Sequence, residues 1–197
     1  MKSSYLRASA ALACAALLSA CGGDDGQLLL GGQISGVTKP GMILTNNGGS
    51  DYEIPVPANG TGVTTFYFPN LISSDDKYNV QVKSVPSNIV PDSCQLVNNS
   101  GRAGFNVTTI QIACEYQTQA LTGTISGLKN ELVLINGSDR QTIPAGATTF
   151  AMARVAQDAP YGISILANPA GQSCTIANGI GTMGAADVNN VVVTCAP

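Results

Sequence analysis

The sequence contains no histidine and no tryptophan, and charged residues make up only 11% of its 197 positions. The missing histidine excludes Ser-His-Asp and Cys-His catalytic arrangements, His-ligated zinc, and the usual general base near neutral pH. The nucleophile motif G-x-S-x-G is also absent. We therefore expect a protein that is not an enzyme and that holds no cofactor.

Positive charge is scarce as well. Without Lys2 and Arg7, which lie in the N-terminal segment discussed next, seven basic residues face twelve acidic ones, a net charge of −5. The basic residues are scattered along the chain and form no cluster. Binding to nucleic acid or to anionic lipid headgroups by electrostatics needs such a cluster. The sequence therefore predicts no nucleic-acid partner.

The N-terminal segment has the three-part layout of a secretory signal. Lys2 and Arg7 supply positive charge, residues 8–18 form an uncharged run rich in Ala and Leu, and the small residues Ser19 and Ala20 follow. The apolar run is far shorter than the roughly 20 residues that span a bilayer, so it does not suit a permanent membrane helix. We expect residues 1–20 to be a cleaved signal peptide.

The end of that segment, Leu18-Ser19-Ala20-Cys21, resembles the lipobox of bacterial lipoproteins. The resemblance implies that the Cys21 thiol is acylated and that Cys21 becomes the first residue of the mature chain. In such lipoproteins an aspartate after the cysteine favours the inner membrane, and here Gly22 stands in that place. The expected location is the cell outer membrane, with residues 21–32 forming the lipidated cysteine and a flexible tether. Within it, residues 28–30 are three leucines, which we expect either to pack onto the first domain as an extra edge segment or to lie in the lipid interface.

The remainder of the chain contains one unit twice. Gln33-Ile34-Ser35-Gly36 matches Thr124-Ile125-Ser126-Gly127, and Thr64-Thr65-Phe66 matches Thr148-Thr149-Phe150. Both copies also share an Ile-Pro pair, a Ser-Cys pair and a terminal cysteine. The first copy is longer, with insertions around residues 58–62 and 87–91. We expect two domains, at residues 33–115 and 121–197, joined by a linker at residues 116–120.

Each copy is expected to be a β-sandwich. Apolar residues alternate with polar ones, as in Ile110, Ile112 and Cys114, and this two-residue period is typical of a half-buried strand. Asn-Gly turn signals recur at short intervals. No helical period follows residue 18. The predicted fold class is all-β, with two tandem antiparallel β-sandwich domains of immunoglobulin-like architecture and about seven strands each.

Four cysteines remain after Cys14 is removed with the signal and Cys21 is acylated: Cys94, Cys114, Cys174 and Cys195. An even number of cysteines in an exported chain indicates disulfides, and four of them allow three connectivities. In each repeat one cysteine begins the predicted sixth strand and the other ends the seventh. Consecutive strands usually pair, which favours Cys94–Cys114 and Cys174–Cys195. A four-cysteine zinc site would need close C-x-x-C pairs, which are missing.

Two further motifs resemble functional sites. Asp75 and Asp76 suggest a carboxylate pair or a calcium site, but adjacent strand residues point to opposite faces and no EF-hand spacing surrounds them. We expect a solvated turn there. Residues 179–184 spell G-x-G-x-x-G, yet they lie between strands and not before a helix, so a glycine-rich hairpin loop is expected and not a dinucleotide site.

Tyr67 is the candidate binding residue. It lies between Phe66 and Phe68, which should both face the core, so Tyr67 should face outward. The second copy has Ala151 in its place. An outward tyrosine on a sheet can stack on a glycan or on a protein partner, although such a residue more often packs against a neighbouring domain or stands alone.

The whole repeat resembles a disulfide-containing unit found singly or in tandem in bacterial lipoproteins and secreted proteins of unknown function. That resemblance carries no catalytic residues. It implies a membrane-anchored lipoprotein of the cell envelope that acts as a non-catalytic binding, spacer or structural module. The alternative is a subunit of an envelope secretion or adhesion assembly. In either case the expected partners are the membrane, through acyl chains on Cys21, and an envelope protein or glycan.

Overall fold

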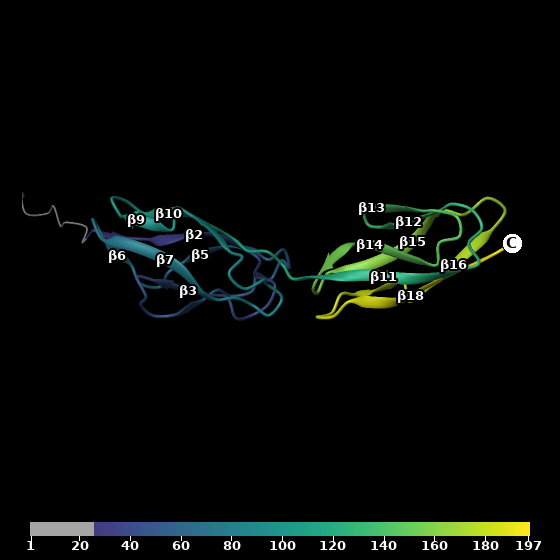
Figure 1. Cartoon of the computed structure of the whole chain (residues 1–197). Helices are drawn as coiled ribbons and strands as arrows, with labels where there is room; N and C mark the ends of the chain where they lie inside the picture. The colour runs from purple at the N-terminus through teal and green to yellow at the C-terminus, as the bar shows by residue number, and fades with distance from the viewer. Residues whose placement is uncertain (1–25) are drawn as a thin grey trace, which may run out of the picture.

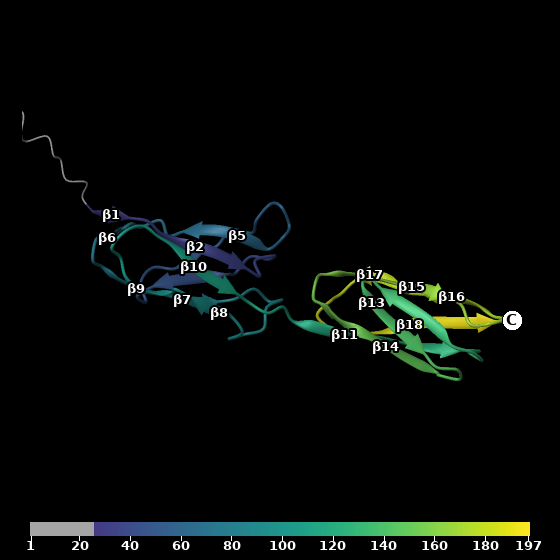
Figure 2. The ribbon, with the colours of Figure 1, turned by 90° about the horizontal axis from the view of Figure 1, so that it is seen from above.

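The computed structural model describes residues 26–197, so the expected signal peptide, Cys21 and the first part of the expected tether lie outside the described residues. Every regular element in the described part is a β-strand, which confirms the all-β class. No helix within residues 26–197 is long and apolar enough to cross a membrane. The strands form two sandwich-like domains that lie end to end (Figures 1 and 2).

The first domain contains strands β1 to β10. One sheet has the order β5-β2-β10-β8, the other has the order β4-β3-β7-β9, and β1 and β6 form a small ladder at one end. The strand bounds are β1 Gln27–Leu28, β2 Leu30–Ser35, β3 Ile43–Asn46, β4 Tyr52–Glu53, β5 Val63–Tyr67, β6 Ile72–Ser73, β7 Lys77–Ser84, β8 Gln95–Val97, β9 Ser100–Arg102 and β10 Val107–Ala113.

The second domain repeats this arrangement with eight strands. Its sheets have the orders β14-β11-β18-β16 and β13-β12-β15-β17. The strand bounds are β11 Thr118–Ser126, β12 Leu132–Asn136, β13 Asp139–Ile143, β14 Thr149–Ala156, β15 Pro160–Ala167, β16 Ser173–Ala177, β17 Ile180–Thr182 and β18 Val188–Ala196. Strand β11 corresponds to β1 and β2 together, and β14 corresponds to β5 and β6 together. These strands are continuous in the second domain and interrupted in the first.

One strand pair in each domain is parallel, which corrects the expectation of purely antiparallel sheets. The first long strand pairs with the last one, β2 with β10 and β11 with β18. All other strand ladders in the described part are antiparallel. The parallel pair joins the first and last parts of each repeat at the centre of an open four-stranded sheet.

Alternate strand residues build a separate apolar core in each domain. In the first domain Leu30, Ile34, Ile110 and Phe66 are buried between the two sheets. In the second domain Phe150 is the one phenylalanine of a core that otherwise consists of aliphatic residues, two methionines and the cystine. Burial of this apolar surface is the main source of stability for such sandwiches.

The N-terminal boundary of the first domain differs from the expected one. The sequence predicts a tether up to residue 32, but all of residues 27–32 except Leu29 lie in β1 and β2, and the Leu30 side chain is fully buried in the core. Gly31 and Gly32 are not flexible spacers. A Cβ on Gly32 would lie 1.9 Å from the Ile110 carbonyl oxygen, and one on Gly31 would lie 2.1 Å from the Phe66 carbonyl oxygen. Glycine is needed there because the neighbouring strands approach closely.

The linker in the structure is also shorter than the expected one at residues 116–120. Strand β11 begins at Thr118, so Thr118 and Ala120 belong to the second domain. Gln117 is the last residue before that strand.

The disulfides join Cys94 to Cys114 and Cys174 to Cys195, the pairing favoured by the sequence. The paired cysteines do not lie on consecutive strands, however. The second bridge spans β16 and β18, which are neighbours in one sheet, while the intervening β17 belongs to the other sheet. In the first domain Cys94 directly precedes β8 and Cys114 directly follows β10. Each disulfide therefore joins the last strand of its domain, at or next to its end, to the neighbouring edge strand.

Equivalent positions in the two domains make the same hydrogen bonds. Ser74 N–H donates to the Gly26 carbonyl, and Gln157 N–H donates to the Gln117 carbonyl in the same way. The side chain of Asn106 accepts from Leu29 N–H at 2.9 Å, and Asp187 accepts from Ala120 N–H at 2.6 Å. These bonds match Gly26 with Gln117, Leu29 with Ala120, and Asn106 with Asp187.

Candidate interaction surfaces

Asp75 and Asp76 stabilise a turn. Asp76 Oδ2 accepts from Ser73 N–H at 2.8 Å, and Arg102 donates to the Asp75 carbonyl at 2.6 Å. Asp75 has a φ of 67°, a left-handed conformation that aspartate tolerates in turns. Among residues 26–197 no group of three or more acidic, Cys or His side chains could hold a metal ion.

The glycine-rich segment at residues 179–184 is not the loop that the sequence suggested. Ile180–Thr182 forms β17, which pairs with β15 through Gly162, Tyr161 and Pro160. Gly181 lies under the Tyr161 ring, since a Cβ there would come within 2.6 Å of the tyrosine oxygen. The glycine makes room for an aromatic side chain on the paired strand.

Tyr67 projects from the outer face of β5. Its side chain is 43% exposed, while Phe66 and Phe68 are buried. The ring lies over Gly31 of the paired strand, because a Cβ on Gly31 would be 2.6 Å from a Tyr67 ring carbon. The tyrosine thus covers a glycine on its neighbour, and part of its ring remains available for stacking.

A groove of about 470 Å³ opens along one edge of the first domain, between β7 and β8. These strands lie in opposite sheets. The groove is lined on one side by Val80, Val82 and Ser84, and on the other by Leu96 and the Cys94 bridge. Sequence reasoning did not predict this feature, although the insertion at residues 87–91 gave a signal, because Pro91 contributes to its wall.

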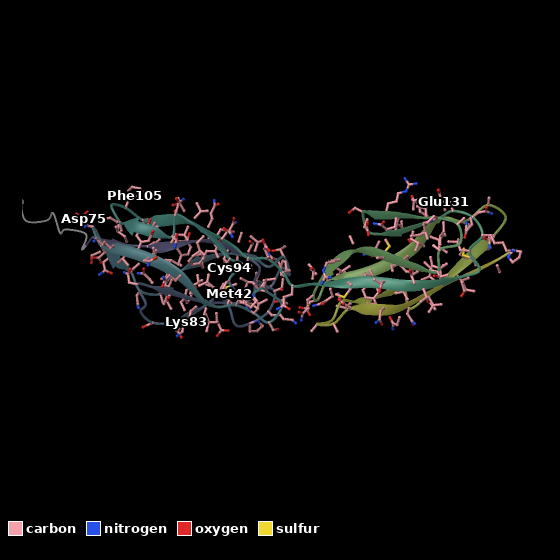
Figure 3. All side chains as sticks on the ribbon, in the orientation of Figure 1. Met42, Asp75, Lys83, Cys94, Phe105 and Glu131 are labelled. Carbon is pink, nitrogen blue, oxygen red and sulfur yellow. A yellow bond between two sulfur atoms is a disulfide. The ribbon has the colours of Figure 1, made fainter. Side chains whose placement is uncertain are left out.

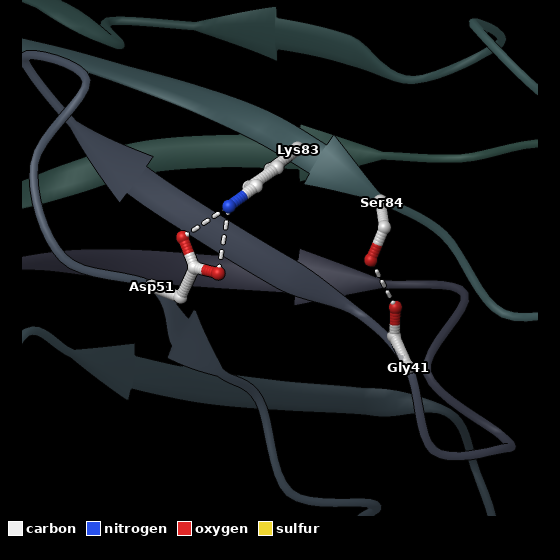
Figure 4. Close-up of polar contacts among 4 residues, drawn as sticks. All are labelled: Gly41, Asp51, Lys83 and Ser84. Atoms are coloured by element: carbon white, nitrogen blue, oxygen red, sulfur yellow. Dashed lines mark hydrogen bonds and ion pairs between the residues drawn. The ribbon is translucent and has the colours of Figure 1, made fainter.

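The groove exposes strand edges. Strand β9 pairs with β7 only at Lys77, Tyr78 and Asn79, and Val80 N–H donates to the Asn99 carbonyl. Within residues 26–197, the part of β7 after Val80 has no partner strand along this edge. Two polar side chains of β7 beside the groove form contacts with the segments around β3 and β4. Lys83 Nζ lies 2.7 Å from both Asp51 carboxylate oxygens, and Ser84 Oγ donates to the Gly41 carbonyl at 2.8 Å (Figure 4).

The junction between the domains is a third surface. Gln117 Nε2 donates to the carbonyls of Ser87 and Ile89 at 3.1 and 3.2 Å, and its backbone N–H donates to the Asn88 carbonyl at 2.8 Å. Its own carbonyl accepts from Gln157 N–H of the second domain at 2.8 Å. One residue therefore hydrogen-bonds to both domains.

The inserted loop of the first copy builds its side of this junction. Asn88 is fully buried and donates to Thr38 Oγ1 at 2.8 Å, and Ile89 is buried against Tyr116 through an isolated antiparallel bridge. An ion pair between Lys39 and Asp158, at 2.8 Å, links the rims of the two domains. Because both partners are partly exposed, this pair contributes only about 0–1 kcal/mol to the junction.

Comparison with known proteins returned structural likenesses only. No family model matches the chain, and no curated protein matches it. The major pilin protein T3.2 from Streptococcus pyogenes is 11% identical, with a TM-score of 0.30, over 87% of this chain and 97% of the pilin. The major pilin protein T-13 from the same species is 12% identical, with a TM-score of 0.28, over 86% and 98% of the two chains. Likenesses at this level carry no argument about function.

Proposed function

We propose that the chain is a lipid-anchored lipoprotein of the bacterial outer membrane, in which two β-sandwich domains form a non-catalytic spacer and binding module. The observation that carries this proposal is the junction at Gln117. Hydrogen bonds from one residue to both domains suit a fixed end-to-end pair that holds a surface at a set distance from the membrane. Two domains joined by a flexible linker would not need these hydrogen bonds.

Two features of the chain support the location. The lipobox at Leu18-Ser19-Ala20-Cys21 supplies the anchor. A disulfide in each domain fits an oxidising compartment such as the periplasm or the cell surface. The exposed face of Tyr67 is the part of the module that we propose for contact with a glycan or protein partner.

The groove between β7 and β8 favours a second candidate function, as a subunit of an envelope secretion or adhesion assembly. Unpaired strand edges are surfaces to which an extended segment of another protein can add. Crosslinking in intact cells through a photoreactive amino acid at position 81 or 96, which both line the groove, separates the two functions. After purification, an assembly subunit should return one partner in constant ratio. A spacer should return none there.

Substitution of the anchor cysteine tests the main proposal. We expect Cys21→Ser to abolish incorporation of labelled palmitate, because serine offers no thiol for the diacylglyceryl group. The protein should then lose its retention with the outer-membrane fraction. Cys14→Ser is the matched control, since Cys14 lies inside the segment that is removed, and it should leave labelling unchanged. If Cys21→Ser fractionates with membranes and labels as the wild type does, the lipoprotein proposal is wrong.

A further inference from the structure

Three large apolar side chains are exposed together at the end of the first domain where the described chain begins. Phe105 is 76% exposed, Leu71 is 45% exposed and Leu29 is 39% exposed. Phe105 lies at this end of the molecule, away from the second domain, as does Asp75 (Figure 3). We call Leu29, Leu71 and Phe105 the apolar tip.

The three residues come from adjacent segments. Leu28 pairs with Ile72, which brings Leu71 beside Leu29. Asn106, next to Phe105, accepts a hydrogen bond from Leu29 N–H. Exposed apolar residues are ordinary when single, but three on neighbouring segments form a patch that marks an interaction surface.

The second domain shows what this end looks like without such a patch. The strand registers and shared hydrogen bonds match Leu29 with Ala120, Leu71 with Arg154, and Phe105 with Ala186. In that domain the same end faces the junction with the first domain. The fold therefore does not require large apolar residues at these positions, and the first domain carries them for another reason.

We infer that the apolar tip sits in the interfacial region of the lipid bilayer, so that the first domain stands end-on on the membrane. This inference rests on the proposed lipid anchor. Only four residues separate Cys21 from Gly26, and five peptide steps span at most about 18 Å. Ser74 N–H holds the Gly26 carbonyl, which fixes the start of the domain next to the tip. An acylated Cys21 would thus keep the apolar tip within reach of the headgroups.

The charges near the tip do not favour electrostatic attraction to the membrane. Asp75 and Asp76 are balanced by Lys77 and Arg102, and the guanidinium of Arg102 is already engaged with the Asp75 carbonyl. Electrostatic attraction to anionic lipid is therefore weak. Contact depends on the apolar side chains, which bury in the interface as those of amphipathic helices do.

A second copy of this chain fits the tip less well. The junction shows what this end of a domain docks on, namely the ten-residue loop at 85–94 that contains Asn88 and Ile89. The corresponding loop at the free end of the second domain has five residues, 168–172, and lacks that segment. Head-to-tail addition of copies therefore has no matching receptor.

The absence of tryptophan gives a direct test. Phe105→Trp and Leu71→Trp each place a single tryptophan at the tip, and Ile180→Trp places one at an 83% exposed position of the second domain. The acylated full-length proteins are reconstituted in phosphatidylcholine vesicles with brominated acyl chains. We expect both tip tryptophans to be blue-shifted and to lose roughly half of their emission, as for a side chain in the interface. Trp at position 180 should be unchanged.

The outcomes separate this inference from the proposed function. Unquenched tryptophan at both tip positions overturns the inference, and palmitate labelling of the same samples shows whether the anchor itself stands. Equal quenching at positions 105 and 180 also overturns it, since the molecule then lies flat. Oligomers of the Cys21→Ser protein in sedimentation, abolished by Phe105→Ser, would assign the tip to a second copy and overturn it as well.

Discussion

Gly32→Ala is expected to destabilise the first domain by about 3 kcal/mol or more, close to the limit at which a small domain remains folded. Gly32 lies in β2 opposite Ile110 of the parallel strand β10. An added Cβ would come 1.9 Å from the Ile110 carbonyl oxygen, and this contact is with backbone that cannot rotate away. Relief requires separation of the two strands that join the ends of the repeat.

Calorimetry of the two-domain chain provides the measurement and its control. The first-domain transition should fall, while the second-domain transition should change little. Gly104→Ala is the matched substitution, because a Cβ at Gly104 meets nothing within 4 Å, and its effect should stay within about 0.5 kcal/mol. A normal first-domain transition in Gly32→Ala would mean that β2 and β10 do not approach as described.

Removal of the Cys174–Cys195 bridge by paired alanine substitution should cost about 3 kcal/mol, the loop-closure value for a bridge across 21 residues. The bridge contributes to the stability of the second domain by packing as well as by loop closure. Both cysteines are buried in a core with a single phenylalanine, so the substitution also removes packed sulfur atoms. Urea unfolding monitored by circular dichroism measures the loss.

The unaltered first domain serves as the control for that experiment, since its Cys94–Cys114 bridge stays in place. Its unfolding midpoint should not move. The converse variant, without Cys94 and Cys114, should shift only the first domain. A second domain that keeps its wild-type midpoint without the bridge would show that strand pairing and the aliphatic core suffice.

The sequence predicted what depends on local pattern. Alternation in segments such as Ile110 to Cys114 indicated strands, and the Asn-Gly pairs indicated turns. The disulfide pairing followed from the position of each cysteine in the repeat. These features depend on residues within a few positions of one another or on comparison of the two copies.

Features that depend on distant segments escaped prediction. Gly31 and Gly32 looked like tether because glycine is common in flexible chains, whereas strands β5 and β10 make it necessary. The parallel pairing of β2 with β10 joins positions some eighty residues apart. Likewise, the insertion at residues 87–91 signalled a loop but not its contact with Gln117.

Residual dipolar couplings of the backbone amides, measured on the soluble Cys21→Ser chain, test the central claim that the two domains form one spacer. The hydrogen bonds of Gln117 predict a single alignment tensor, with the same magnitude and orientation in residues 27–113 and 118–196. Tensors of clearly different magnitude in the two domains would mean that they reorient independently. In that case the chain is a flexible pair of modules and not a spacer.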